Sequence, residues 1–332
     1  MSLSWLSLFP DHIQSMLRSL PSSLLDELEE IRLREGRALE VNAGGHFYYL
    51  TAKGEMTSNP EHAYRPSHKD SNTLLDLITN HSLYTMEEEL RRGFITITGG
   101  HRVGLSGRTV LSGGQVAHLR DISGFNVRVA REVQGVADQL LPKLLDFKHK
   151  TINHTLIISP PQQGKTTMIR DLARQISYGT WRHSKAQWQG LKVAVVDERS
   201  EIAGSKRGVP SFDVGPRTDV MDSCPKAEGM MMMIRSMSPD VLIVDEIGRK
   251  EDIDALIEAL HAGVRVIATA HGSSVEELQT RLKAISSLGS DFFKAYVVLS
   301  RKGKAMTYRL WDDKGRTMLN YDDVQRGKEY YG

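Results

Sequence analysis

The second half of the chain alternates short apolar segments with segments whose apolar residues recur at the period of a helix. Of all the features of the sequence, this pattern limits the possible folds the most. Apolar runs predict strands at 155–158, 193–196, 241–244, 266–269 and 296–299. Apolar residues at i, i+3, i+4 and i+7 predict helices around 168–176, 253–260 and 275–285, and a further helix contains 230–234. Buried strands alternating with helices are typical of a parallel sheet covered on both faces, whose ligands bind at the carboxyl ends of the strands.

A phosphate-binding loop directly follows the first of these strands. It consists of Ser159, Pro160, Pro161, Gln162, Gln163, Gly164, Lys165, Thr166 and Thr167. The segment fits G-x-x-x-x-G-K-[ST] except that Ser159 replaces the first glycine. We expect its backbone N–H groups to hold nucleotide phosphates, Lys165 to neutralise the β- and γ-phosphates, and Thr166 to ligate Mg²⁺. The alternative is a chance Gly-Lys-Thr at an ordinary strand-to-helix turn.

Acidic residues follow two of the buried strands. Asp245 and Glu246 end one strand, where an Asp can hold the water shell of Mg²⁺ and a Glu can polarise the attacking water. A second strand ends in Asp197 and Glu198, which could position water or pair with Arg199. Solvated acids at strand ends are the simpler alternative.

A threonine and a histidine end the strand predicted at 266–269. Thr269 and His271 are expected beside the γ-phosphate, where hydrolysis could be sensed. A lone histidine at a strand end is otherwise a structural hydrogen-bonding group. The sequence leaves both roles open.

The amino-terminal half has a weaker pattern. The length of 332 residues exceeds the roughly 100–200 residues of one domain, and the composition shift near 145–153 predicts domains at 1–150 and 151–332. In the first we expect a mixed α/β domain with two short helices in the first 30 residues, strands at 31–33 and 47–50 paired across a turn at 42–45, and a mobile loop at 51–71. Further helices are expected at 73–78 and 86–91, and further strands at 94–98, 101–105 and 125–130. In the second domain, 179–190 is expected to be a surface excursion.

Composition excludes several functional classes. The chain has 43 basic and 41 acidic residues, a net charge of +2, so no large electrostatic footprint for nucleic acid or anionic lipid is expected. Its single cysteine, Cys224, cannot form an intramolecular disulfide and fits a reducing cytoplasm. No apolar run approaches the roughly 20 residues that span a bilayer, and the amino terminus lacks the pattern of an export signal.

Several segments closely resemble the stage III sporulation protein AA family. They are residues 196–204 (VDERSEIAG), 217–220 (RTDV), 224–230 (CPKAEGM), 237–240 (MSPD) and 245–248 (DEIG), with 99–108 (GGHRVGLSGR) upstream. That family is similar in turn to the ATPases of type II and type IV secretion and of pilus systems. The resemblance implies a RecA-like P-loop NTPase domain, with a mainly parallel sheet, preceded by a smaller amino-terminal domain. It also implies that Glu198, Glu246 and His271 surround ATP, with Mg²⁺ as the metal.

The same resemblance implies a biological setting. It implies an ATPase of the mother cell during endospore formation, forming a homo-oligomer, expected to be a hexamer, with other stage III proteins of a channel toward the forespore. The protein would be cytoplasmic and attached to the membrane through these partners, without inserting into it directly.

Ring ATPases of this kind complete the site with an arginine from a neighbouring subunit. The candidates are Arg102, Arg108, Arg128, Arg131, Arg207 and Arg217, of which we favour those in the amino-terminal domain.

Two other functions stay open. A nucleic-acid-remodelling ATPase would use a basic patch of Arg91, Arg92, Arg102 and Arg108, although only Phe94 is nearby for stacking. A nucleotide-gated scaffold would bind ATP without turning it over.

Overall fold

The chain folds into two compact units. The computed structural model describes residues 4–79, 87–97, 99–130, 132–161, 163–275, 277–278, 292–302 and 305–320. One unit comprises Met1–Arg131 with Gly204–Lys206, and the other comprises Glu132–Ala203 with Arg207–Gly332. The division thus falls earlier than the boundary expected near 150. The cause is a leucine-rich segment, in which Leu140, Leu141 and Leu144 are fully buried in the core of the second unit.

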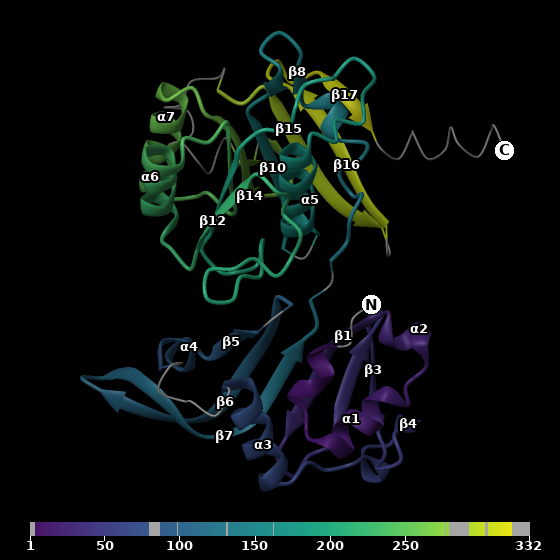
Figure 1. Ribbon diagram of the computed structural model, residues 1–332. Helices are drawn as coiled ribbons and strands as arrows, with labels where there is room; N and C mark the ends of the chain where they lie inside the picture. The colour runs from purple at the N-terminus through teal and green to yellow at the C-terminus, as the bar shows by residue number, and fades with distance from the viewer. Residues whose placement is uncertain are drawn as a thin grey trace, which may run out of the picture. The chain divides into compact units, whose positions relative to one another are not determined.

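The first unit is built on a seven-stranded sheet with the order β4-β3-β2-β1-β7-β6-β5, in which every pair is antiparallel (Figure 1). The strands are β1 (Leu28–Arg34), β2 (Glu40–Ala43), β3 (His46–Leu50), β4 (Met56–Thr57), β5 (Phe94–Ile97), β6 (His101–Ser112) and β7 (Gln115–Arg128). The helices are η1 (Ser4–Leu8), α1 (Asp11–Arg18), α2 (Ser22–Leu25), η2 (Pro60–His62), α3 (His68–Thr79) and α4 (Glu87–Arg92). Apolar residues of η1, α1 and α3 pack with alternate residues of β1 and β7 in one core.

Two expectations for this unit are wrong. The segments 31–33 and 47–50 do not pair, because the short strand β2 lies between them and pairs with both β1 and β3. The turn at Gly44 and Gly45, both with positive φ, therefore joins β2 to β3. Segment 51–71 is also not one loop, since it contains β4, η2 and the start of α3, where Asp70 is buried.

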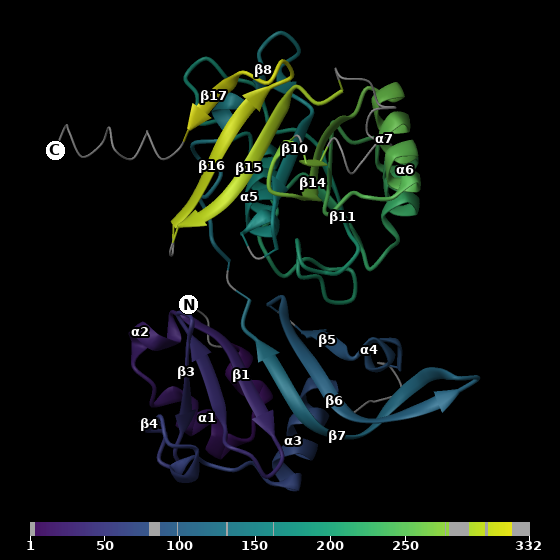
Figure 2. The same ribbon diagram turned by 180° about the vertical axis from the view of Figure 1, so that it is seen from behind.

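The second unit contains an eight-stranded sheet with the order β12-β11-β13-β14-β10-β15-β16-β17 (Figure 2). Its strands are β10 (Thr155–Ser159), β11 (Val193–Asp197), β12 (Thr218–Asp222), β13 (Val241–Val244), β14 (Arg265–His271), β15 (Ala295–Lys302), β16 (Ala305–Asp312) and β17 (Thr317–Asn320). The first six strands in this order, β12, β11, β13, β14, β10 and β15, pair in parallel. Strand β16 pairs antiparallel with both β15 and β17. The expected strands are confirmed as β10, β11, β13, β14 and β15, whereas β12, β16 and β17 were not expected.

Helices cover both faces of this sheet, as the alternation predicted. Helix α5 (Lys165–Tyr178) packs on one face, where Ile157, Val195 and Ile243 point toward it. Helices α6 (Lys226–Met237) and α7 (Lys250–His261) pack on the other face, against Leu156 and Val244. Most of the helix expected at 275–285 lies outside the described residues. The unit also contains η4 (Leu141–Lys143) and the small pair β8 (Leu145–Asp146) and β9 (Thr151–Ile152).

The segment 179–190 is not simply a surface excursion. Trp181 is only 3% exposed and joins the core beneath α5. Its Nε1 donates to the carbonyl oxygen of Trp188 at 2.8 Å, and the two rings lie 5.2 Å apart. Trp181 and Trp188 of this segment are therefore packing residues.

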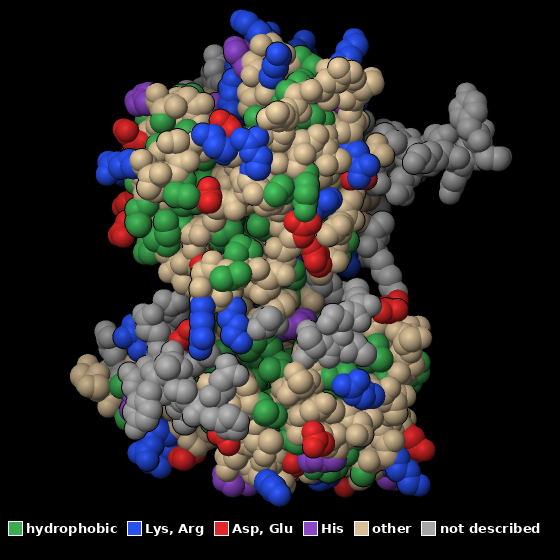
Figure 3. Space-filling model, viewed as in Figure 1, with side chains coloured by type: hydrophobic (Ala, Val, Ile, Leu, Met, Phe, Trp, Pro, Cys, Tyr) green, Lys and Arg blue, Asp and Glu red, His purple; other side chains and the backbone are tan. Residues whose placement is uncertain are grey.

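The outer surface of α6 is partly apolar. Met232 and Met237 are exposed, and Figure 3 shows apolar side chains gathered where α6 lies in Figure 1. No helix in the described part of the chain has the length and apolar character needed to cross a membrane.

Candidate nucleotide site

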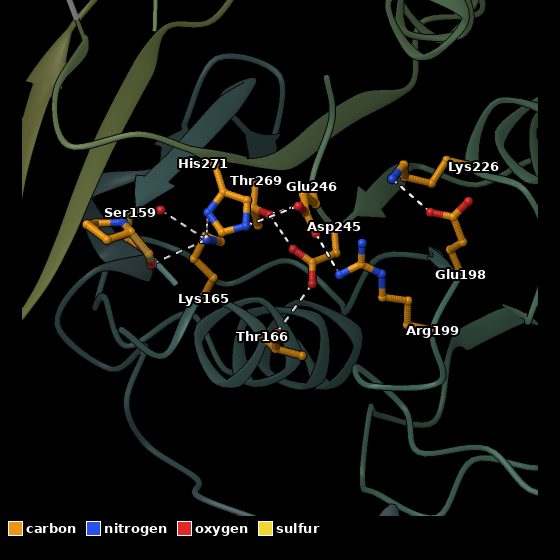
Figure 4. A network of polar contacts seen from close by, with 11 residues as sticks. Ser159, Lys165, Thr166, Glu198, Arg199, Lys226, Asp245, Glu246, Thr269 and His271 are labelled. Atoms are coloured by element: carbon orange, nitrogen blue, oxygen red, sulfur yellow. Dashed lines mark hydrogen bonds and ion pairs between the residues drawn. The ribbon is translucent and has the colours of Figure 1, made fainter. Parts of the chain in front are cut away.

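The residues singled out by sequence lie at the carboxyl ends of four neighbouring strands, β11, β13, β14 and β10 (Figure 4). The phosphate loop follows β10, the acidic pair follows β13, and His271 ends β14. In-register pairing sets Ser159 of β10 opposite His271 of β14. Parallel pairing thus brings residues far apart in sequence to one sheet edge.

The loop after β10 turns into α5 at Gly164. Gly164 has φ +94°, and a Cβ built there would clash with Cε of Met306 on β16. Only glycine adopts this backbone conformation without strain. Pro160, Pro161 and Gln163 precede it and Thr167 lies in the first turn of α5, whereas Gln162 lies outside the described residues.

Lys165 points back into the loop that it follows. Its Nζ donates to the carbonyl oxygens of Ser159, at 3.0 Å, and Pro160, at 3.5 Å, and lies 3.3 Å from Nδ1 of His271. Burial lowers the pKa of Lys165, and the nearby carboxylates of Asp245 and Glu246 oppose that shift. The ammonium is thus held inside the loop, next to His271.

Two threonines hold the Asp245 carboxylate. Thr166 Oγ1 donates to Oδ2 at 3.3 Å, and the buried Thr269 donates to Oδ1. The Thr269 hydroxyl also accepts the backbone N–H of Glu246 at 2.8 Å. Thr269 was expected beside the γ-phosphate, and the contacts that the structure shows for its hydroxyl are with the acidic pair.

These oxygens fit the protein side of a Mg²⁺ site. Mg²⁺ usually takes one or two protein oxygens and completes its shell with water and substrate phosphates. The hydroxyl of Thr166 and the carboxylate of Asp245 supply such a pair on adjacent elements. Among the described residues, no group of three or more His, Cys, Asp or Glu side chains could hold a metal ion. A Mg²⁺ ion held by this pair would complete its shell with water and phosphate oxygens.

Glu246 has an unusual backbone conformation and contacts two side chains of the site. It is not a glycine, yet its φ is +52°, and strain of this kind concentrates at functional sites. Oε2 lies 3.0 Å from Nη1 of Arg199, and Oε1 lies 3.0 Å from Nε2 of His271. The Lys165 ammonium can only donate, so Nδ1 of His271 is placed to accept from it, and Nε2 faces the Glu246 carboxylate. A polar chain thus runs from Lys165 through His271 and Glu246 to Arg199.

Glu198 does not join this chain. Its Oε2 lies 2.8 Å from Nζ of Lys226, in the first turn of α6, and Figure 4 shows the pair apart from Asp245. Of the two roles left open for the acids after β11, pairing with Arg199 falls instead to Glu246.

Sequence reasoning missed a buried arginine beneath the site. Arg170 of α5 is only 6% exposed, donates to the carbonyl oxygens of Glu201 and Ile202, and stacks on the ring of Phe212 at 3.9 Å. The signal available in the sequence was an arginine next to Met168, Ile169 and Leu172 on a buried helix.

The arginines considered as trans-acting groups have varied surroundings. Arg102 lies over the ring of Phe94 at 3.5 Å, Arg128 lies 3.9 Å from Glu30, and Arg217 donates to the carbonyl oxygen of Gly190. Arg108 opposes another arginine, Arg120, across the β6–β7 ladder, and Arg207 has a positive φ. Arg131 lies outside the described residues.

A parallel sheet with a phosphate loop after one strand and an acidic pair after another defines a RecA-like P-loop NTPase domain, here preceded by a smaller unit. Solved secretion and pilus ATPases share this fold. The Legionella pneumophila ATPase DotB matches with a TM-score of 0.53 and 16% identity, over 96% of this chain and 82% of its own. The pilus retraction motor PilT with bound ADP matches with a TM-score of 0.58 and 14% identity, over 93% of this chain and 87% of its own.

Sequence comparison shows the family. Residues 7–318 match the family model described as "Sporulation stage III, protein AA". Stage III sporulation protein AA of Bacillus subtilis (strain 168) is 46% identical over 317 residues, which are 95% of this chain and 97% of that protein. The chain belongs to the sporulation stage III protein AA family, which confirms the resemblance drawn from sequence.

Proposed function

We propose that this protein is a Mg²⁺-dependent ATPase that powers assembly or transport in a sporulation-specific, secretion-like channel between mother cell and forespore. The observation that carries the proposal is the meeting of Lys165, the Thr166–Asp245 pair and the His271–Glu246 pair at one sheet edge. These are the three functions that ATP hydrolysis needs: charge for the phosphates, oxygen ligands for a metal, and a carboxylate to polarise water.

Each residue has a defined task in this scheme. Lys165 and the loop N–H groups bind the β- and γ-phosphates, and Mg²⁺ beside Thr166 and Asp245 would neutralise charge on them. Glu246 orients a water molecule and accepts its proton. The water oxygen bonds to the γ-phosphorus while the bond to the bridging oxygen breaks, which releases ADP and phosphate. His271 senses the γ-phosphate. Glu198, which pairs with Lys226 in the structure, would have to leave that pair to contact the nucleotide.

The assembly and its location are part of the same proposal. Its basis is the family name together with the fold shared with secretion and pilus ATPases. We propose a homo-oligomer, a hexamer, in the cytoplasm of the mother cell, held at the membrane by other stage III proteins. A nucleic-acid role is less well supported, because the guanidinium of Arg102 covers Phe94, the aromatic ring of the basic patch.

Phosphate release and oligomer mass of the purified full chain, with and without Mg²⁺ and ATP, test the proposal. Lys165→Ala should abolish nucleotide binding. Glu246→Gln should keep binding but lower turnover by about 10²–10⁴-fold, the usual contribution of a general base. Lys185→Ala and Glu258→Gln, which alter exposed side chains elsewhere in the second unit, are the controls.

Unchanged turnover in both site variants would contradict the proposal. An ATP-dependent change of oligomer mass without phosphate release would favour the nucleotide-gated scaffold instead. Stimulation of turnover by DNA or RNA at low salt would favour nucleic-acid remodelling.

A further inference from the structure

Arg199 reaches the site from a strand end that carries no other part of the polar chain. It follows β11, and its Nη1 lies 3.0 Å from Oε2 of Glu246. Figure 4 shows its guanidinium extended toward Asp245 and Glu246, while Glu198 turns away to Lys226. The segment therefore directs one side chain into the site and the adjacent one out of it.

A rigid frame holds the segment that carries Arg199. The Asp197 carboxylate, which is buried, accepts the backbone N–H groups of Glu201, Ile202 and Ala203 at 2.8, 2.9 and 2.9 Å. From below, Arg170 donates to the carbonyl oxygen of Glu201 at 2.6 Å. The donors and acceptors on both sides fix the base from which Arg199 extends.

The tip of the segment is fixed as well. Ser200 has φ +55°, and its hydroxyl donates to Oδ1 of Asp222 at 2.6 Å. Residues held in left-handed conformations persist where the surrounding structure determines them, often at ligand sites. The backbone on either side of Arg199 is thus constrained, although its side chain is 58% exposed.

The ion pair alone does not explain this frame. A solvent-accessible ion pair contributes about 0–1 kcal/mol to stability. That contribution is small beside the cost of holding Ser200 in a left-handed conformation. The position has a clearer use in phosphoryl transfer, where an arginine commonly stabilises charge that develops on the γ-phosphate. A guanidinium has five N–H donors in a planar fork, so it can serve a carboxylate and a phosphate oxygen from one place.

We propose that Arg199 is the arginine of the nucleotide site, supplied by the same chain that supplies Lys165. It holds Glu246 as seen in the structure and, once ATP is bound, donates to a γ-phosphate oxygen. This inference rests on the proposed ATPase function and replaces the trans-acting arginine expected from sequence. ADP lacks the γ-phosphate, so Arg199 distinguishes the two nucleotides.

Affinity and turnover of Arg199→Ala test the proposal. With Mg²⁺ present, affinity for the non-hydrolysable analogue AMP-PNP should fall about tenfold, as for loss of one charge-assisted contact, while ADP affinity changes less than about twofold. Turnover should fall by about 10³-fold, the lower range for loss of such an arginine. Arg199→Lys should restore part of the AMP-PNP affinity and part of the turnover, because lysine keeps the positive charge but lacks the planar guanidinium with its paired donors. Arg235→Ala on the exposed side of α6 is the matched control.

A mixing experiment distinguishes action within one chain from action between chains. Arg199→Ala and Lys165→Ala proteins are combined under conditions of subunit exchange, and phosphate release is measured. If Arg199 served a neighbouring subunit, mixed oligomers would contain sites with both residues intact, and activity would return. We expect no recovery, because each chain lacks one residue of its own site.

Recovery on mixing would overturn the proposal, as would equal loss of AMP-PNP and ADP affinity in a variant that melts at the wild-type temperature. If the wild-type protein releases no phosphate, the ATPase proposal fails. The comparison of AMP-PNP with ADP affinity still decides the role of Arg199 in that case.

Discussion

Asp197→Asn offers a quantitative test of the frame beneath Arg199. The Asp197 side chain is 2% exposed, and burial raises its pKa from 3.8 to about 6, against the effect of the backbone N–H groups of Glu201, Ile202 and Ala203. Because the folded protein binds this proton more tightly than the unfolded chain, the stabilisation is complete below about pH 3.8 and is lost as pH rises through 6. A shift of about two pKa units corresponds to about 3 kcal/mol.

A histidine of the same unit contributes with the opposite sign. Burial lowers the pKa of His154 from 6.5 to about 4, with smaller effects from Arg265 and Lys294, and its Nδ1 accepts the N–H of Val266 at 3.2 Å. Its stabilisation is complete above pH 6.5 and is lost as pH falls through 4. In the wild type, Asp197 and His154 therefore change the free energy of unfolding in opposite directions as pH rises. Only a comparison with the Asp197→Asn variant separates the contribution of Asp197.

The assay is urea unfolding at steps between pH 4 and pH 7, followed by tryptophan fluorescence. Trp181, Trp188 and Trp311 lie in the second unit and report on it. The free energy of unfolding of Asp197→Asn, minus that of wild type, should rise by about 2 to 3 kcal/mol from pH 4 to pH 7. Asp219→Asn, which alters an exposed carboxylate on β12, should run parallel to wild type. Parallel curves for Asp197→Asn as well would refute the reasoning.

Two further variants test other parts of the second unit. Gly164→Ala should lower the free energy of unfolding by at least about 1 kcal/mol, because alanine is strained at φ +94° and its Cβ would meet Met306. It should also weaken nucleotide binding. Thermal melting and nucleotide titration measure the two effects, and a variant with the wild-type melting temperature and full affinity would contradict them. Trp181→Ala should cost about 3–5 kcal/mol in urea unfolding, because it empties a core position and leaves the Trp188 carbonyl without its donor; a loss below 1 kcal/mol would mean that the ring does not support the core.

The second unit was largely predictable because its strands are continuous apolar runs. β10, β11, β13 and β14 are buried on both faces, so local composition alone marked them. The unexpected strand β12 reads Thr-Asp-Val-Met-Asp at a sheet edge, where polar residues remove the apolar signal. In the first unit, β2 spans only four residues, too few to show a period. Because β2 was not predicted, the segments 31–33 and 47–50 were wrongly paired with each other.

The site was predictable in its members but not in its pairings. The order of motifs along the chain and the geometry of parallel sheets placed Lys165, Asp245 and His271 at one edge. Arg199 pairs with Glu246 and not with Glu198 because Glu198 points toward Lys226 in the first turn of α6 and forms an ion pair with it. Such choices are tertiary, and no local pattern encodes them.

The polar chain has a consequence for how a ligand is captured. Lys165 and Arg199 are cations and Asp245 and Glu246 are anions, so the formal charges of these four side chains cancel. Long-range steering of a polyanion needs an uncompensated field. These groups therefore contribute little to the rate at which a nucleotide arrives, and they act only at contact, when phosphates and metal replace the pairings that the side chains make with one another.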